Sequence, residues 1–258
     1  MSNPTSTELT PIAAAEPDEA AVDSPEPPPA VVATGLALHG SRGLVYGPVD
    51  LVLPAASLLV VQGTQGAGRS SLLLTLAGRM VPDRGARLTV LGLDLPRART
   101  QVQRRAAIAG FAGIDDLDES VRVSDLVRER LAWLTPWYHR VPPVTQRAFA
   151  AHASAVWGDR PIPRVGSMIW DLDEIDVMLL RITLAMAQRP DLLVVDDIDQ
   201  VRDGVRRQFV WTRLEAIAAA GTTVIASVSS LGEAAAMSWV VPPQQLHLST
   251  GPHAIAAA

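Results

Sequence analysis

The stretch Gly63-Thr64-Gln65-Gly66-Ala67-Gly68-Arg69-Ser70-Ser71 decides the fold of this chain. It follows the apolar run 58–61 and precedes a second apolar run at 72–77. This pattern predicts a turn between a buried strand and a helix. The spacing is that of a phosphate-binding loop, G-x-x-x-x-G-K-[ST], except that Arg69 stands where lysine is expected.

The loop predicts a cradle for a polyphosphate. Its glycines allow a tight turn whose backbone N–H groups point inward, helped by the positive end of the following helix. Ser70 would place a hydroxyl on Mg²⁺. The residues expected to contact the nucleotide are Gly63, Gln65, Gly66, Ala67, Gly68, Arg69, Ser70 and Ser71. The alternative is a glycine-rich turn that binds nothing.

Composition restricts the class of protein. The formal net charge is −5, and the six acidic residues among the first 30 account for all of it, so the rest of the chain is close to neutral. We therefore expect no nucleic-acid partner, which usually requires a strongly basic face. The chain has no cysteine and no lysine, and all 22 basic residues are arginine. An arginine in place of lysine at position 69 therefore agrees with the choice of basic residue throughout the chain. Guanidinium is nevertheless larger and planar where ammonium is a compact charge.

The chain divides into three parts. Residues 1–30 are rich in proline, alanine and acidic residues and are predicted to be a disordered tail. Residues 31–240 predict one α/β domain: short strands of an antiparallel edge over 31–53, then the phosphate loop in a parallel sheet with flanking helices. Within it, 115–173 shows helical spacing and predicts an α-helical subdomain. Residues 241–258 are expected to be an irregular tail.

Four of the six tryptophans fall in the helical segment, at positions 133, 137, 157 and 170, together with Tyr138. We expect these aromatic side chains mostly to pack a small core of the subdomain. The alternative is that an exposed tryptophan belongs to a groove for a partner, where aromatics are enriched.

A second element of the predicted site lies more than a hundred residues after the loop. The apolar run 192–195 ends in Asp196 and Asp197, as expected of a central parallel strand with function at its carboxyl end. Asp196 is placed to hold Mg²⁺, and Asp197 could orient or deprotonate an attacking water, although it is one methylene shorter than glutamate. The alternative is a polar end to a buried strand, with Asp197 capping the next helix.

Together these motifs resemble the ATP-binding cassette (ABC) ATPases, the motor subunits of ABC transporters. The resemblance runs from about residue 31 to 236, and its most specific part is the run 185–196, AMAQRPDLLVVD. It implies a P-loop NTPase core with an antiparallel β edge and an α-helical subdomain. It also implies ATP and Mg²⁺ as cofactors, and a dimer with another nucleotide-binding subunit, identical or different.

The departures from the family pattern concern hydrolysis. The signature L-S-G-G-Q aligns with 172–176, LDEID, where only the leucine survives and acidic side chains would face the partner's phosphate. The expected glutamine aligns near Ile114, and the expected histidine aligns at Ser229. The aromatic that stacks on adenine should fall near residue 40, where His39 is a weak substitute and Tyr46 comes late.

We therefore expect a degenerate ATP-binding subunit of a membrane transport or remodelling complex, with weak or no hydrolysis. No uninterrupted apolar run reaches the 18 residues that a span requires, and no signal peptide precedes the domain. A membrane-spanning partner would then hold the chain at the cytoplasmic face of the cell membrane. One alternative is a non-catalytic scaffold with a vestigial loop. Another is a small-molecule kinase, for which 115–173 offers no supporting constellation of acid, base and arginine.

Overall fold

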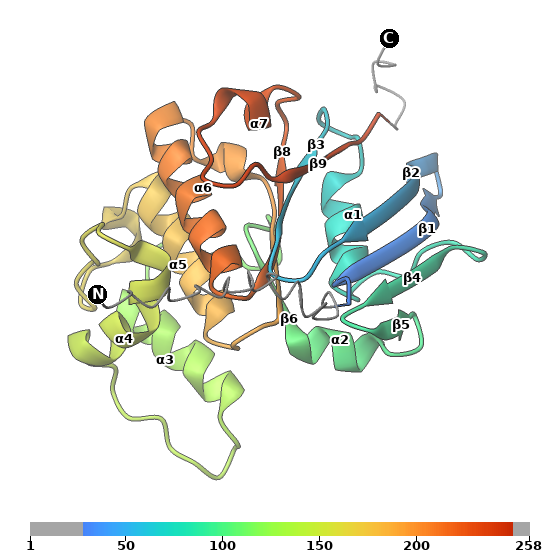
Figure 1. Cartoon of the computed structure of the whole chain (residues 1–258). Helices are drawn as coiled ribbons and strands as arrows, with labels where there is room; N and C mark the ends of the chain where they lie inside the picture. Colours follow the sequence, from blue (N-terminus) through green and yellow to red (C-terminus); the bar gives the residue numbers. More distant parts are fainter. Residues whose placement is uncertain (1–27, 250–258) are drawn as a thin grey trace, which may run out of the picture.

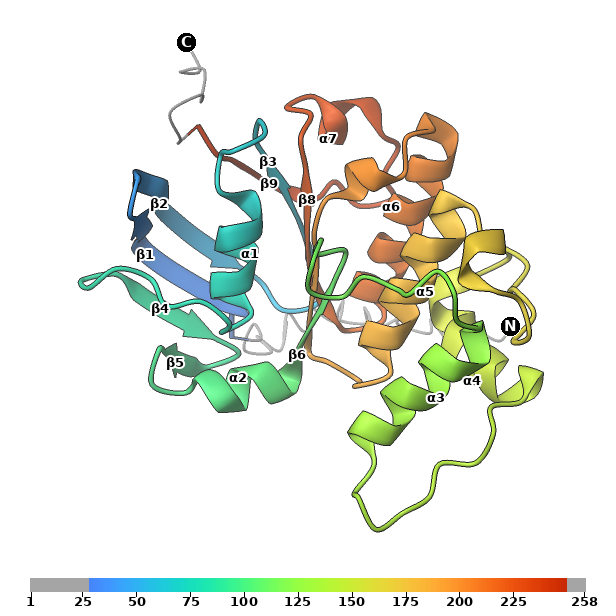
Figure 2. The ribbon, with the colours of Figure 1, turned by 180° about the vertical axis from the view of Figure 1, so that it is seen from behind.

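The computed structural model describes residues 28–249, so most of the predicted tail 1–30 and residues 250–258 lie outside the described residues. Two β-sheets and a group of helices make up the described chain (Figure 1). The helices on either side of the central sheet are seen from behind in Figure 2. The predicted α/β class, with an antiparallel sheet beside a parallel one, is confirmed.

The central sheet is parallel and has five strands in the order β6-β7-β8-β3-β9. They are β3 (Leu58–Gln62), β6 (Ala106–Ala109), β7 (Leu192–Val195), β8 (Thr223–Val228) and β9 (Gln244–His247). Every residue of β3, β7 and β8 is buried, which explains why these strands are mostly apolar. Because the strands are parallel, the loops after β3, β6, β7 and β8 meet at one edge.

The antiparallel sheet has four strands in the order β2-β1-β4-β5. These are β1 (Val31–Gly40), β2 (Gly43–Leu53), β4 (Arg87–Val90) and β5 (Leu93–Leu95). Helix α1 (Arg69–Leu76) contacts both β2 and β8, and its leucines 72, 73 and 76 are fully buried. The helix that follows the phosphate loop is therefore held between the two sheets.

Most of the remaining helices lie on the side of the central sheet away from α1. They are α2 (Arg99–Arg105), α3 (Val123–Leu134), α4 (Gln146–Trp157), α5 (Glu174–Met186), α6 (Gly204–Ala219) and α7 (Glu233–Ala236), with the short 3-10 helices η1 (Ile169–Asp171) and η2 (Ile198–Gln200). Helices α3 and α4 lie in the segment 115–173. Among residues 28–249, no helix is long and apolar enough to span a membrane.

The prediction of an irregular segment over 241–258 is wrong for β9. Residues 244–247 pair in parallel with β3 and form an edge of the central sheet. The sequence of β9, Gln-Gln-Leu-His, is mostly exposed and lacks an apolar alternation. Backbone pairing with a neighbouring strand creates this element, and such tertiary context is invisible to a local pattern.

The expectation that the tryptophans of the helical segment mostly pack a core of their own is also wrong. Only Trp157 is buried, and its indole N–H donates a 3.0 Å hydrogen bond to the Thr183 hydroxyl on α5. Trp133, Trp137 and Trp170 are 78%, 94% and 59% exposed. Trp157 belongs to a core that is continuous with strands β6, β7 and β8, so α3 and α4 are stabilised by the main domain.

Candidate nucleotide site

The phosphate loop connects the end of β3 to the start of α1 at Arg69. Gly66 and Gly68 both have φ of +84°, a conformation that L side chains rarely adopt. A Cβ on Gly68 would lie 2.2 Å from the carbonyl oxygen of Val45 and 2.9 Å from the Cβ of Tyr46. The loop therefore approaches β2 so closely that only glycine fits at position 68.

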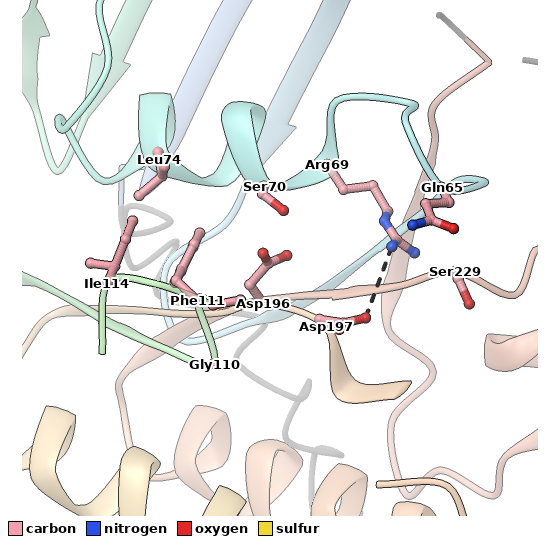
Figure 3. Close-up of a pocket in the computed structure, with 11 residues that line it drawn as sticks. Gln65, Arg69, Ser70, Leu74, Gly110, Phe111, Ile114, Asp196, Asp197 and Ser229 are labelled. Atoms are coloured by element: carbon pink, nitrogen blue, oxygen red, sulfur yellow. Dashed lines mark ion pairs between the residues drawn. The ribbon is translucent and has the colours of Figure 1, made fainter. Parts of the chain in front are cut away.

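A cavity of about 500 Å³ opens beside this loop. Its lining is formed by Gln65, Arg69, Ser70, Leu74, Gly110, Phe111, Ala112, Ile114, Asp196, Asp197 and Ser229. Five of the predicted site residues, from the loop and from the end of β7, thus meet in one place, as Figure 3 shows. The other five predicted residues, Gly63, Gly66, Ala67, Gly68 and Ser71, do not line the cavity. A Cβ on Gly63 would lie 3.1 Å from the Cβ of Ala67 and 3.0 Å from the carbonyl oxygen of Leu248, which follows β9.

The guanidinium of Arg69 is the cationic group of the cavity. Its side chain is only 12% exposed, and its two terminal nitrogens lie 3.9 Å from carboxylate oxygens of Asp197 and Asp199. These separations are too long for hydrogen bonds. The Nη1 atom of Arg69 is buried and has no hydrogen-bond partner among the residues that the structure describes. An unsatisfied buried guanidinium N–H is costly, and an anionic oxygen would satisfy it, so the cavity fits a phosphate group.

Asp196 and Ser70 point into the same space between β7 and α1 (Figure 3). Asp196 is buried, and one of its carboxylate oxygens accepts a 2.5 Å hydrogen bond from the Ser227 hydroxyl on β8. The described residues contain no group of three or more histidine, cysteine or acidic side chains that could hold a metal by themselves. Ser70 and Asp196 fit Mg²⁺, which favours oxygen ligands and is commonly held jointly with the phosphates of a substrate.

Asp197 follows Asp196 in the left-handed region, with φ of +52°. Its backbone N–H donates a 2.9 Å hydrogen bond to the Ser227 hydroxyl. Burial and the neighbouring charge of Asp199 raise the pKa of Asp197 above its usual range. Its carboxylate faces Arg69 across the cavity.

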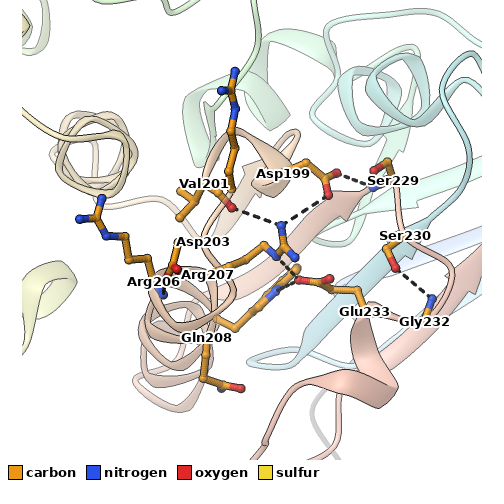
Figure 4. A network of polar contacts seen from close by, with 12 residues as sticks. Asp199, Val201, Asp203, Arg206, Arg207, Gln208, Ser229, Ser230, Gly232 and Glu233 are labelled. Atoms are coloured by element: carbon orange, nitrogen blue, oxygen red, sulfur yellow. Dashed lines mark hydrogen bonds and ion pairs between the residues drawn. The ribbon is translucent and has the colours of Figure 1, made fainter.

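Sequence reasoning missed Asp199, which anchors one side of the site (Figure 4). Its carboxylate accepts a 2.5 Å hydrogen bond from the backbone N–H of Ser229, and its other oxygen lies 4.0 Å from Arg207. Arg207 in turn pairs at 2.7 Å with the buried carboxylate of Glu233, which also accepts the indole N–H of Trp211. This network holds Ser229 at the mouth of the cavity. Its only sequence signal is a third aspartate two residues after Asp197.

Ile114 lies on the apolar side of the cavity, with Phe111 and Leu74. The turn that carries it is fixed by Asp115, whose carboxylate accepts the backbone N–H groups of residues 110 and 111. The same carboxylate accepts hydrogen bonds of 3.0 and 2.8 Å from the buried guanidinium of Arg181 on α5. This turn is therefore tied to α5, and at position 114 it presents an aliphatic side chain.

Neither candidate for the adenine contact presents a free aromatic ring. Tyr46 is fully buried and its hydroxyl donates a 2.7 Å hydrogen bond to Thr75, while burial raises the pKa of Tyr46 to about 12. His39 is exposed, and its Nδ1 lies 2.6 Å from the Asp83 carboxylate. That carboxylate also accepts the His39 backbone N–H. Tyr46 therefore belongs to the packing under the loop, and His39 to a surface turn.

The acidic residues at 172–176 have partners within the chain. Arg160 contacts Asp176 at 2.6 Å and Asp173 at 3.2 Å, and Arg206 lies 3.3 Å from Asp173. The carboxylate of Glu174 accepts the backbone N–H groups of residues 202 and 203. The start of α5 thus presents paired carboxylates, and their repulsion of an approaching phosphate is weaker than for free carboxylates.

The chain is similar in sequence to several Nod factor export ATP-binding proteins. The chain is 30% identical over 210 residues to the Nod factor export ATP-binding protein I of Burkholderia pseudomallei, and 28% identical over 199 residues to that of Rhizobium meliloti. These alignments cover 79% and 76% of this chain. The chain spans 60% and 55% of the two relatives' lengths. No protein-family model matches the chain.

Solved structures show the same fold. CbiO1 from Clostridium perfringens, part of the ABC transporter complex CbiONQ, superposes with a TM-score of 0.63 at 14% identity over 79% of each chain. An inward-facing putative metal-chelate type ABC transporter gives a TM-score of 0.65 at 16% identity, covering 86% of this chain and 80% of the other. The described chain therefore has the fold of ABC transporter ATPases.

Proposed function

We propose that this chain, an ABC-type ATP-binding protein by sequence similarity and fold, is the nucleotide-binding subunit of a membrane transport complex. The observation that carries the proposal is Arg69, a largely buried cation at the end of a phosphate loop, whose buried Nη1 has no hydrogen-bond partner among the described residues. ATP phosphates would occupy the loop and meet this guanidinium. Ser70 and Asp196 would hold Mg²⁺, which neutralises phosphate charge when bound.

Removal of Mg²⁺ is expected to weaken ATP binding by roughly tenfold or more, because like charges that face each other cost several kcal/mol. Asp196 and Asp197 line the cavity against the single guanidinium of Arg69, so metal-free ATP meets two carboxylates. Equilibrium dialysis of the full chain with labelled ATP, in Mg²⁺ and in EDTA, measures the effect. Asp196→Asn should reduce the difference between the two conditions. Equal affinity in both conditions would contradict the proposed metal role of Asp196.

Weak hydrolysis is the second part of the proposal. Phosphoryl transfer depends on positioning a water and stabilising charge in the transition state. Here the cavity has Ile114 and Ser229 where the family pattern has glutamine and histidine, and neither side chain can act as a base at neutral pH. Asp197 is the remaining candidate base, and its carboxylate lies 3.9 Å from the guanidinium of Arg69.

We expect the isolated chain to release phosphate from Mg²⁺-ATP at well below about 1 s⁻¹, the lower end of typical enzyme turnover. A coupled phosphate assay measures this rate, with Asp196→Asn as the baseline for contaminating ATPases. A turnover of several per second that the variant abolishes would show that the chain hydrolyses ATP efficiently alone. A slow rate combined with clear ATP binding supports a binding subunit.

The proposed partners are a membrane-spanning subunit and a second nucleotide-binding subunit, identical or different. A cavity of about 340 Å³ between the core and the helical segment offers a place for the membrane subunit. Ile114 and Arg181 border this cavity, so the docked partner would touch the turn that lines the nucleotide site. Such docking would hold the chain at the cytoplasmic face of the membrane.

A further inference from the structure

The segment between α3 and α4 carries exposed aromatic side chains that the nucleotide site does not use. We call residues 133–141, which are the last two residues of α3 and the chain that follows them, the aromatic loop. Its exposed large side chains are Trp133 (78%), Leu134 (37%), Trp137 (94%) and Tyr138 (67%). In Figures 1 and 2 the chain between α3 and α4 extends beyond the neighbouring helices, away from the central sheet.

The tip of the aromatic loop is an ordered turn. The backbone N–H of His139 donates a 2.9 Å hydrogen bond to the carbonyl of Pro136, so Trp137 and Tyr138 occupy the two central positions of a four-residue turn. The rings of Trp137 and Tyr138 pack edge to face, with centroids 5.9 Å apart. The ring centroids of Tyr138 and His139 lie 4.7 Å apart. The turn thus holds adjacent aromatic rings outward, and less ordering entropy is lost when they become buried.

The residues that follow α3 carry basic but no acidic side chains. Residues 135–158 contain Arg140 and Arg147 and no aspartate or glutamate, whereas Glu129 on α3 lines the same cavity as Trp133. Arg140 and Arg147 are exposed, and Arg140 follows the turn directly. The cavity beside α3 is lined by Trp133 but not by Trp137 or Tyr138. The tip therefore lies outside this cavity.

We propose that the aromatic loop inserts its tip into the interfacial region of an anionic lipid bilayer. Tryptophan and tyrosine, with an apolar ring and a polar group, are enriched at this depth of a membrane. Basic residues beside them are attracted by anionic headgroups. The loop would give the chain a lipid contact independent of any membrane subunit and of ATP binding.

Cosedimentation of the full chain with protein-free vesicles tests this proposal. Binding is expected to vesicles of phosphatidylcholine with phosphatidylglycerol, and to be weaker by about tenfold with phosphatidylcholine alone, because anionic headgroups attract basic residues near the surface. The double variant Trp137→Ala/Tyr138→Ala should lower binding by roughly tenfold, since each ring buries a large apolar area. Arg140→Glu should weaken binding only to the anionic vesicles.

Trp170→Ala is the matched control, because Trp170 is an exposed tryptophan outside the loop. It should leave vesicle binding unchanged. The proposal is overturned if the wild type does not bind protein-free vesicles, or if Trp170→Ala and the double variant lose binding equally. It is also overturned if the tip variants abolish self-association or capture of a membrane protein while vesicle binding is unchanged. None of these variants touches the nucleotide cavity, so ATP binding should persist in all of them.

Discussion

Arg69→Ala is expected to lower the affinity for Mg²⁺-ATP about a hundredfold, because a buried charge-assisted hydrogen bond contributes about 1.5–3 kcal/mol and the variant leaves acidic neighbours unopposed. The guanidinium is 12% exposed and lies 3.9 Å from both Asp197 and Asp199. Its loss would leave these carboxylates facing the phosphates. Isothermal titration calorimetry measures the change.

Two further variants make the Arg69 experiment specific. Arg84→Ala removes an exposed arginine from the turn before β4 and should bind Mg²⁺-ATP as the wild type does. Arg69→Lys restores the usual cation of a phosphate loop and should retain binding, although lysine forms fewer directed hydrogen bonds. Thermal unfolding of each variant verifies that the fold is intact. If Arg69→Ala bound Mg²⁺-ATP with unchanged affinity, Arg69 would have no role in holding phosphate.

Gly68→Ala is expected to destabilise the fold by about 3–4 kcal/mol and to abolish nucleotide binding. A left-handed φ costs a non-glycine residue about 1–2 kcal/mol, and overpacking costs about 1–3 kcal/mol more. At Gly68 the new Cβ would lie 2.2 Å from a backbone oxygen, so β2 or the start of α1 must move. Urea denaturation measures the loss in free energy of unfolding.

Gly66→Ala is the matched control in the same loop. Gly66 has the same φ of +84°, but a Cβ there would have no neighbour within 4 Å. Only the backbone strain remains, so the expected loss of stability is about 1–2 kcal/mol. Equal destabilisation by the two variants would mean that the close approach of the loop to β2 does not contribute to stability.

The fold was largely predictable from the sequence because the parallel strands and the phosphate loop have strong local patterns. Runs such as 192–195 are continuously apolar because they are buried on both faces, and a parallel topology then brings Asp196 to the loop after β3. The meeting of Arg69 with Asp196 and Asp197 in one cavity follows from this topology.

Other features depend on contacts between distant residues and have no local signal. The edge strand β9 exists through backbone pairing with β3. Asp199 matters because Arg207 and the Ser229 N–H converge on it. The sequence of 172–176 predicted unpaired carboxylates. In the structure, Arg160 and Arg206, which lie on other segments, pair with Asp173. Helical spacing likewise could not separate the buried Trp157 from exposed Trp137.

The most direct test of the central claim is a calorimetric titration of the full wild-type chain with Mg²⁺-ATP. The proposed function predicts saturable binding of one nucleotide per chain. It also predicts that ATP is recovered largely intact from the bound complex, as expected of a site with an arginine cradle and few catalytic groups. The absence of binding heat, together with no retention of labelled ATP, would contradict the claim and identify the loop as a vestigial turn in a scaffold.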